Sequence, residues 1–341
     1  MSVHDFKRAA EKLRAWTSKP KQDESEDTAE AKLPENLTVH SPVHWPGFKN
    51  RFERNLNLAL FMRSLKKVLH PDDPPTAVIT TAAIPSDLAK ARPDLNWVYY
   101  CVDDLSQWPG LDGESLLRLE RDMLPHIKSF VSVSNNLQTR LGALGHDSTL
   151  ITHGIDLEHW NIERRALGAA KPVALYWGHA DRRLDSQVCL ALADRLRLRM
   201  VGPQTDVDPL LREHPDIDWT GSVDYAQLPD EAARADVLVM PYADLAVTRA
   251  MQPLKLKEYL ATGLPVIATP LPATEPWADT LDLSADPAEF AKLTFVRART
   301  ELDAAQANAR KRLQQEGWSS KAHAFEDVFS KHAPECSEDK R

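Results

Sequence analysis

Residues Met251–Thr269, MQPLKLKEYLATGLPVIAT, are the stretch of this sequence that decides the fold. Pro253 suits the first position of a helix, where a missing N–H costs nothing. Gly263 suits a left-handed residue that ends the helix, and the proline two residues later prevents its continuation. Val266–Ala268 then reads as a buried strand, and Val237–Met240 is another one upstream. Strand, helix and strand in this order predict a βαβ unit of a parallel sheet.

The start of this predicted helix has the chemistry of an anion site. A helix that begins at the carboxyl edge of a parallel sheet presents free N–H groups and a positive dipole end. Lys255 and Glu258 are three residues apart and therefore share one helical face. The cation suits a diphosphate, and the carboxylate one turn deeper suits sugar hydroxyls. The alternative is an ordinary amphipathic helix on which the two residues form a solvated ion pair.

The string PLKLKEYLATGLPVIAT resembles the nucleotide-sugar-binding segment of GT-B glycosyltransferases of the bacterial cell-surface polysaccharide and teichuronic acid biosynthesis type. WVYYCVDDLSQWPG at Trp97–Gly110 is similar to a strand and loop of that family, and His153–Asp156 to its hinge. Gly178–Asp185 and Asp236–Tyr242 resemble its nucleotide-domain turn and donor-site strand. The resemblance implies an α/β fold of two doubly wound Rossmann-like domains facing across a cleft.

One departure from the family concerns the N-terminal domain. That domain normally opens with a strand, a glycine-rich loop and a helix, and nothing in Met1–Glu35 resembles them. We therefore expect an incomplete N-terminal domain, entered near Leu37–Val43 as its first strand, with sheet edges left unpaired.

The domain organisation follows from composition and from strand candidates at α/β spacing. We expect a basic helical piece and disordered linker at 1–33, an acceptor-side Rossmann-like domain at 34–160, a nucleotide-sugar-binding domain at 161–300, and helices at 301–341 that cross back and end in a disordered tail. The further strands expected are Ala77–Thr81, Val98–Val102, Phe130–Ser134, Thr149–Thr152, Val173–Trp177, Arg199–Val201 and Ile217–Thr220.

Charge and cysteine usage narrow the partners and the compartment. The 341 residues carry a net charge of −8, which argues against nucleic acid as the main partner. Three scattered cysteines fit no metal spacing and suit a reducing cytoplasm. No apolar run approaches the ~20 residues that span a bilayer.

The stretch 48–69, FKNRFERNLNLALFMRSLKKVL, predicts a basic amphipathic helix. Phe52, Leu56, Ala59 and Leu60 share helical spacing, and the six basic residues of the stretch outnumber its one acidic residue, Glu53. Such a helix can lie on an anionic membrane surface, here the inner face of the cell membrane. The alternative is that its apolar face packs on the N-terminal sheet and its basic face is solvated.

Asp103 and Asp104 are the candidate catalytic residues, because they follow the predicted strand Val98–Val102 at the edge that faces the cleft. Glycosyl transfer needs a base within hydrogen-bond reach of the acceptor hydroxyl. Either aspartate can serve, with Asp103 preferred. The alternative for both is an Asx-turn or a helix N-cap.

The donor-binding candidates come from three segments: Gly178, Arg182 and Arg183 after the strand Val173–Trp177, Thr248 and Arg249 in the following loop, and Pro253, Leu254, Lys255 and Glu258. An arginine after the turn could neutralise the leaving diphosphate. The resemblance assigns Glu258 to the nucleotide ribose. Retaining relatives carry a second Glu eight positions earlier, where this sequence has Ala250. We expect no cofactor beyond the nucleotide-sugar co-substrate and no metal site.

These features predict a glycosyltransferase of the hexosyltransferase type. It would transfer a sugar from a nucleotide-diphosphate donor to a cell-surface glycan or lipid-linked acceptor in cell-envelope polysaccharide biosynthesis. One alternative is a catalytically inactive GT-B relative that acts as an assembly or scaffold protein. A less favoured one is a nucleotide-sugar 2-epimerase.

Overall fold

The computed structural model describes residues 34–108, 110–163 and 170–331. The helix and linker predicted at 1–33 and the tail after 331 lie outside these residues. Residues 34–42 belong to a unit separate from residues 43–341 and contain a turn in which Leu37 N–H donates to Pro34 O. The strand predicted at Leu37–Val43 is wrong, since none of these residues is in a strand. A strand needs ladder bonds to a neighbour, and Pro42 has no N–H to donate.

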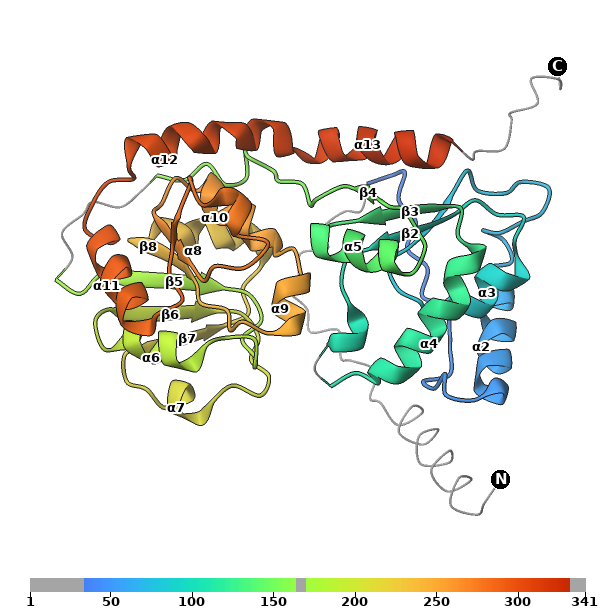
Figure 1. Ribbon diagram of the computed structural model, residues 1–341, viewed down its shortest axis with the longest axis horizontal. Helices are drawn as coiled ribbons and strands as arrows, with labels where there is room; N and C mark the ends of the chain where they lie inside the picture. Colours follow the sequence, from blue (N-terminus) through green and yellow to red (C-terminus); the bar gives the residue numbers. More distant parts are fainter. Residues whose placement is uncertain (1–33, 109, 164–169, 332–341) are drawn as a thin grey trace, which may run out of the picture. The chain divides into compact units, whose positions relative to one another are not determined.

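The first sheet has four parallel strands in the order β1-β2-β3-β4 (Figure 1). They span Val78–Thr80, Trp97–Cys101, Ser129–Ser132 and Thr149–Leu150. Helices α3 (Ser86–Ala91), α4 (Gly113–Met123) and α5 (Asn135–Ala143) connect them, and α2 (Arg51–Ser64) precedes β1. All four strands therefore end at one carboxyl edge, where Asp103 and Asp104 follow β2.

Helix α2 differs from its sequence-based description in which side is buried. Asn57 and Phe61 are its buried residues, whereas Phe52 is 73% exposed. The Asn57 side chain explains this, because its Oδ1 accepts Trp45 N–H at 2.6 Å and its Nδ2 donates to Gly47 O at 2.9 Å. These bonds turn the Asn57 face inward.

The second sheet has six parallel strands in the order β10-β9-β8-β5-β6-β7. They span Asp282–Leu283, Val266–Ala268, Val237–Met240, Val173–Trp177, Arg197–Val201 and Ile217–Gly221. The order reverses between β5 and β8, and a doubly wound sheet opens a crevice at such a point. Gly178 follows β5 and Pro241 follows β8, so both lie at this switch point.

The helices of this part of the chain are α6 (Ser186–Ala193), α7 (Pro209–Arg212), α8 (Leu228–Ala233), α9 (Ala246–Ala250), α10 (Leu254–Ala261) and α11 (Pro287–Arg297). The two parallel sheets and their helices fit two Rossmann-like domains and confirm the fold class. Neither β10 nor α11 was predicted from the sequence. Trp97, Trp160 and Trp177 are core residues and are at most 3% exposed.

Helix α10 begins one residue later than expected. Pro253 is the N-cap, with an extended ψ of 119°, and the first helical residue is Leu254. Gly263 has φ of +75°, so it does supply the left-handed residue that ends the helix.

The C-terminal segment contacts the first sheet. Helix α12 (Ala304–Ala309), the 3₁₀ helix η5 (Arg310–Glu316) and α13 (Trp318–Ser330) follow α11. Val328 of α13 packs in a cluster with Val98 and Val131, and Asn96 Nδ2 donates to Phe329 O at 2.9 Å. No helix in the described residues has the length and apolarity that crossing a membrane requires.

Candidate active site

Lys255 lies over the turn that follows β5. Its Nζ donates to the Tyr176 hydroxyl at 3.0 Å and lies 4.2 Å from the centre of that ring. A Cβ added to Gly178 would come within 2.0 Å of Lys255 Nζ, and Gly178 has φ of +133°. Glycine is therefore required for this approach. Lys255 forms no ion pair with any carboxylate of the described residues, so its charge is available to an anion.

Glu258 is held by aromatic residues. Trp177 Nε1–H donates to its Oε2 at 3.1 Å, and the Tyr225 hydroxyl donates to its Oε1 at 3.4 Å. Burial raises the pKa of Glu258, while the Trp177 bond and the charge of Lys255 act in the opposite direction. Tyr225, in the 3₁₀ helix η3 (Tyr225–Gln227), stacks on His159 at 4.5 Å. The carboxylate is thus oriented and remains able to accept further hydrogen bonds.

The structure separates the two candidate catalytic aspartates. Asp104 caps the 3₁₀ helix η1 (Leu105–Gln107) by accepting Ser106 N–H at 3.2 Å, and its Oδ2 pairs with Arg140 Nε at 3.2 Å. Asp103 has no carboxylate hydrogen bond or ion pair with the described residues. Burial raises its pKa to about 6, although the Arg183 charge lowers it. Asp103 therefore keeps a carboxylate that is free to accept a proton.

The two adjacent arginines point to different partners. Arg183 is 9% exposed, and its guanidinium pairs with Asp181 at 2.8 Å and lies 4.8 Å from the centre of the Trp108 ring. Arg182 is exposed and pairs with Asp206. The charge of Arg183 lowers the pKa of Asp103, so Arg183 is the arginine that shares the site with this aspartate.

The remaining donor-binding candidates also differ in what their side chains contact. The Thr248 hydroxyl is buried and bonded within its own loop, donating to Ala243 O at 2.6 Å and accepting Leu245 N–H at 2.8 Å. Arg249 is exposed and pairs with Asp244 at 3.2 Å. Leu254 is 47% exposed at the start of α10, beside the N-cap Pro253. The structure thus groups Gly178, Lys255 and Glu258 around one turn, and Thr248 is a loop-stabilising residue.

Residues 183–294 match the family described as Glycosyl transferases group 1. A 60-residue stretch is 42% identical to a Bacillus subtilis (strain 168) protein that carries the provisional name of a teichuronic acid biosynthesis glycosyltransferase, TuaH. That match covers 18% of this chain and 15% of the relative, so the chain spans only a small part of the relative's length.

Two solved structures are similar over most of the chain. Sucrose-phosphate synthase (tll1590) from Thermosynechococcus elongatus has a TM-score of 0.64 and 19% identity, covering 88% of this chain and 86% of that one. Anabaena Alr3699/HepE in complex with UDP-glucose has a TM-score of 0.64 and 12% identity, covering 83% and 84%. The chain has the GT-B fold. Together with the matched family and relative, this fold supports a GT-B glycosyltransferase.

Sequence reasoning on this GT-B chain missed the residues that hold the site in place. Tyr176, Trp177 and Tyr225 position Lys255 and Glu258, and the two adjacent aromatic residues directly before Gly178 were the available signal. Lys257, on the opposite side of α10, is 3% exposed, and its Nζ bonds Glu316 Oε2 at 2.5 Å and Thr152 Oγ1 at 3.0 Å. This bond joins α10 to the end of η5.

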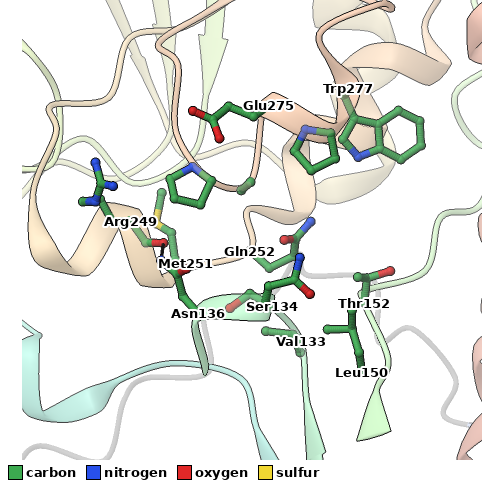
Figure 2. Close-up of a pocket in the computed structure, with 14 residues that line it drawn as sticks. Val133, Ser134, Asn136, Leu150, Thr152, Arg249, Met251, Gln252, Glu275 and Trp277 are labelled. Carbon is green, nitrogen blue, oxygen red and sulfur yellow. Dashed lines mark hydrogen bonds between the residues drawn. The ribbon is translucent and has the colours of Figure 1, made fainter. Parts of the chain in front are cut away.

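A cavity of about 390 Å³ lies beside the α9–α10 connection (Figure 2). Its wall includes Ser134 and Asn136, beside the start of α5, together with Gln252 and Trp277. Ser134 Oγ donates to Ala250 O at 3.0 Å, and Asn136 Nδ2 donates to Arg249 O at 2.6 Å. These bonds tie the connection that leads into α10 to the carboxyl edge of the first sheet.

Proposed function

We propose that this protein transfers a sugar from a nucleotide-diphosphate donor to a hydroxyl of a cell-surface glycan or lipid-linked acceptor. The observation that carries the proposal is the ammonium of Lys255, which has no carboxylate partner among the described residues and lies against Gly178 at the switch point of the second sheet. An open doubly wound sheet binds nucleotides at this position. The half-buried Glu258, held by Trp177, then accepts hydrogen bonds from the ribose.

The transfer step uses Asp103 as the base. Its carboxylate takes the proton of the acceptor hydroxyl as the oxygen forms a bond to the anomeric carbon of the donor sugar. The bond between that carbon and the diphosphate breaks, and the electron pair leaves with the nucleoside diphosphate. Lys255 and Arg183 stabilise the charge that develops on this leaving group. Because these cations can do so, we propose transfer without a bound metal ion.

Named relatives support a uridine donor. The Anabaena structure is described as a complex with UDP-glucose, and another similar structure, of a TarM variant from S. aureus, contains UDP and a GlcNAc-glycerol. These ligands belong to those proteins. We propose the same class of donor here, with a hexose as the transferred sugar.

We also propose that the protein works in the cytoplasm, with peripheral contact to the inner face of the cell membrane. Support comes from α2, whose exposed Phe52 and Met62 lie beside Arg51 and Arg63. Apolar side chains flanked by cations favour an anionic interface.

Calorimetric titration of UDP, GDP and dTDP tests the donor part. We expect one diphosphate to bind to the wild-type protein, and the Glu258→Ala variant to bind it about 10–100-fold more weakly, as expected for lost hydrogen bonds to a charged group. Thr300→Ala, three residues after the end of α11, serves as the control. The proposal is overturned by a wild-type protein that binds none of the three.

A further inference from the structure

A basic groove of about 870 Å³ runs between α2, α3 and α4, far along the chain from the donor helix. Six cationic side chains line it: Lys49, Arg51, Arg54, Lys90, Arg118 and Arg121. The lining carboxylates are Asp87 and Asp122, so six positive charges face two negative ones and leave +4. The whole chain carries −8. A cleft lined by one sign of charge attracts ligands of the other sign.

The two carboxylates of the groove both pair with one arginine. Arg54 Nη2 pairs with Asp87 at 2.7 Å, and Arg54 Nη1 pairs with Asp122 at 2.6 Å. This arginine therefore joins α2 to both α3 and α4 and builds the groove. Its structural role makes it unsuitable for carrying a ligand.

Four other cations of the groove are open to a ligand. Arg51, Lys90, Arg118 and Arg121 are exposed and form no ion pair with the described residues. They come from three neighbouring helices, α2, α3 and α4 (Figure 1), and all four line the groove. An arrangement of this kind holds an elongated anion better than a single phosphate.

The second half of α4 lines the groove, on the side that leads into the amino end of β3. Helix α4 begins with the N-cap Asp112, which Lys49 of the groove pairs at 2.8 Å. Arg121 and His126 line the groove at the other end of α4. The 11 residues of this helix span about 16 Å, the length of several sugar rings.

We propose that the basic groove binds an anionic glycan chain, with carboxylate or phosphate groups along it. This inference rests on the proposed function, since it names the class of acceptor. A polymer is favoured over a lipid surface because the four open cations line a groove. A flat bilayer would contact the side of α2 that exposes Phe52, which does not line the groove.

The test uses the full chain and a fluorescent oligogalacturonate of about ten sugars, with neutral dextran as the uncharged probe. The groove variant combines Arg51→Glu, Lys90→Glu and Arg121→Glu. The control variant combines Arg195→Glu, Arg212→Glu and Lys311→Glu, which are exposed in the second domain and make the same change in charge. Equal thermal unfolding of both variants shows that folding is intact.

We expect the wild-type protein to bind oligogalacturonate but not dextran, with affinity that falls as salt rises. The groove variant should bind about tenfold more weakly or worse, and the control variant should stay within about twofold. Equal losses in the two variants would overturn the proposal, because net charge alone would then explain binding. So would loss of binding to phosphatidylglycerol vesicles in the groove variant without any binding of the soluble polymer.

Donor titrations separate this inference from the function on which it rests. Groove-dependent polymer binding by a protein that takes no nucleoside diphosphate would refute the transferase and keep an anionic glycan site. Normal diphosphate binding with no polymer binding would refute the groove alone.

Discussion

Replacing Asp103 with Asn tests the centre of the proposed mechanism. The variant keeps the shape of the side chain and removes its ability to take a proton, and loss of a positioned base typically costs about 10²–10⁴-fold in rate. Donor affinity should stay unchanged, because Asp103 lies in the first domain and Lys255 and Glu258 in the second. The observable is therefore a fall in kcat without a change in the calorimetric affinity for the diphosphate.

The pH profile of kcat/KM gives the size of the expected effect. Burial raises the pKa of Asp103 to about 6. A base works only when deprotonated, so kcat/KM should be level above pH 6 and fall as pH drops through that value. At pH 5 only about a tenth of the carboxylate is ionised, and each further pH unit should cost about another factor of ten.

The assay is release of the nucleoside diphosphate, measured from pH 4.5 to 8 with the donor that calorimetry selects and a glycan fraction as acceptor. Asp104→Asn serves as the comparison variant, since the Asp104 carboxylate is already bonded to Ser106 and Arg140. The reasoning is refuted if Asp103→Asn turns over at the wild-type rate, or if the wild-type profile stays flat down to pH 4.5.

Three further predictions follow from the same contacts. Arg183→Gln should move the acidic limb of the pH profile to higher pH, because the charge that lowers the pKa of Asp103 is removed; Arg182→Gln, whose partner is the exposed Asp206, should leave the limb in place. Lys255→Ala should weaken diphosphate binding about 10–100-fold by calorimetry, and Gly178→Ala should also weaken it, because its Cβ would displace the ammonium; undiminished affinity in both would rule out this helix start as the phosphate site. Lys257→Ala should lower the free energy of unfolding in urea by about 1.5–3 kcal/mol, because Glu316 and Thr152 lose a charged hydrogen-bond partner while Lys321 still pairs with Glu316; Lys292→Ala, which breaks an exposed pair with Glu289, should change it by no more than about 0.5 kcal/mol, and equal effects would contradict this explanation.

The second sheet and helix α10 could be predicted from the sequence because the patterns that indicate them are local. Strands β5, β8 and β9 are short apolar runs, and Gly263 ends α10 with the positive φ that only glycine adopts at little cost. The strand expected at Leu37–Val43 failed for the opposite reason. Alternating apolar residues favour a strand, but its formation depends on a neighbour that the local sequence does not specify. Strand β10 has only two residues, too few to show the alternation of polar and apolar residues that indicates a strand.

The site shows a sharper limit, because adjacent residues of the same type receive different roles. Asp103 and Asp104 are equivalent in composition and both follow β2, yet Arg140 of α5 reaches only the second of them. That arginine is held in place by Glu120 of α4, to which its Nη1 donates at 2.9 Å. Arg182 and Arg183 divide in the same manner through Asp206 and Asp181. For the aspartates, Arg140 of a different helix occupies Asp104 and leaves Asp103 free for the site. Both arginines are paired, and it is Arg183, buried beside Trp108, that lies at the site. Motif reading can therefore locate the dipeptide that carries the chemistry, whereas the choice between its two members depends on packing.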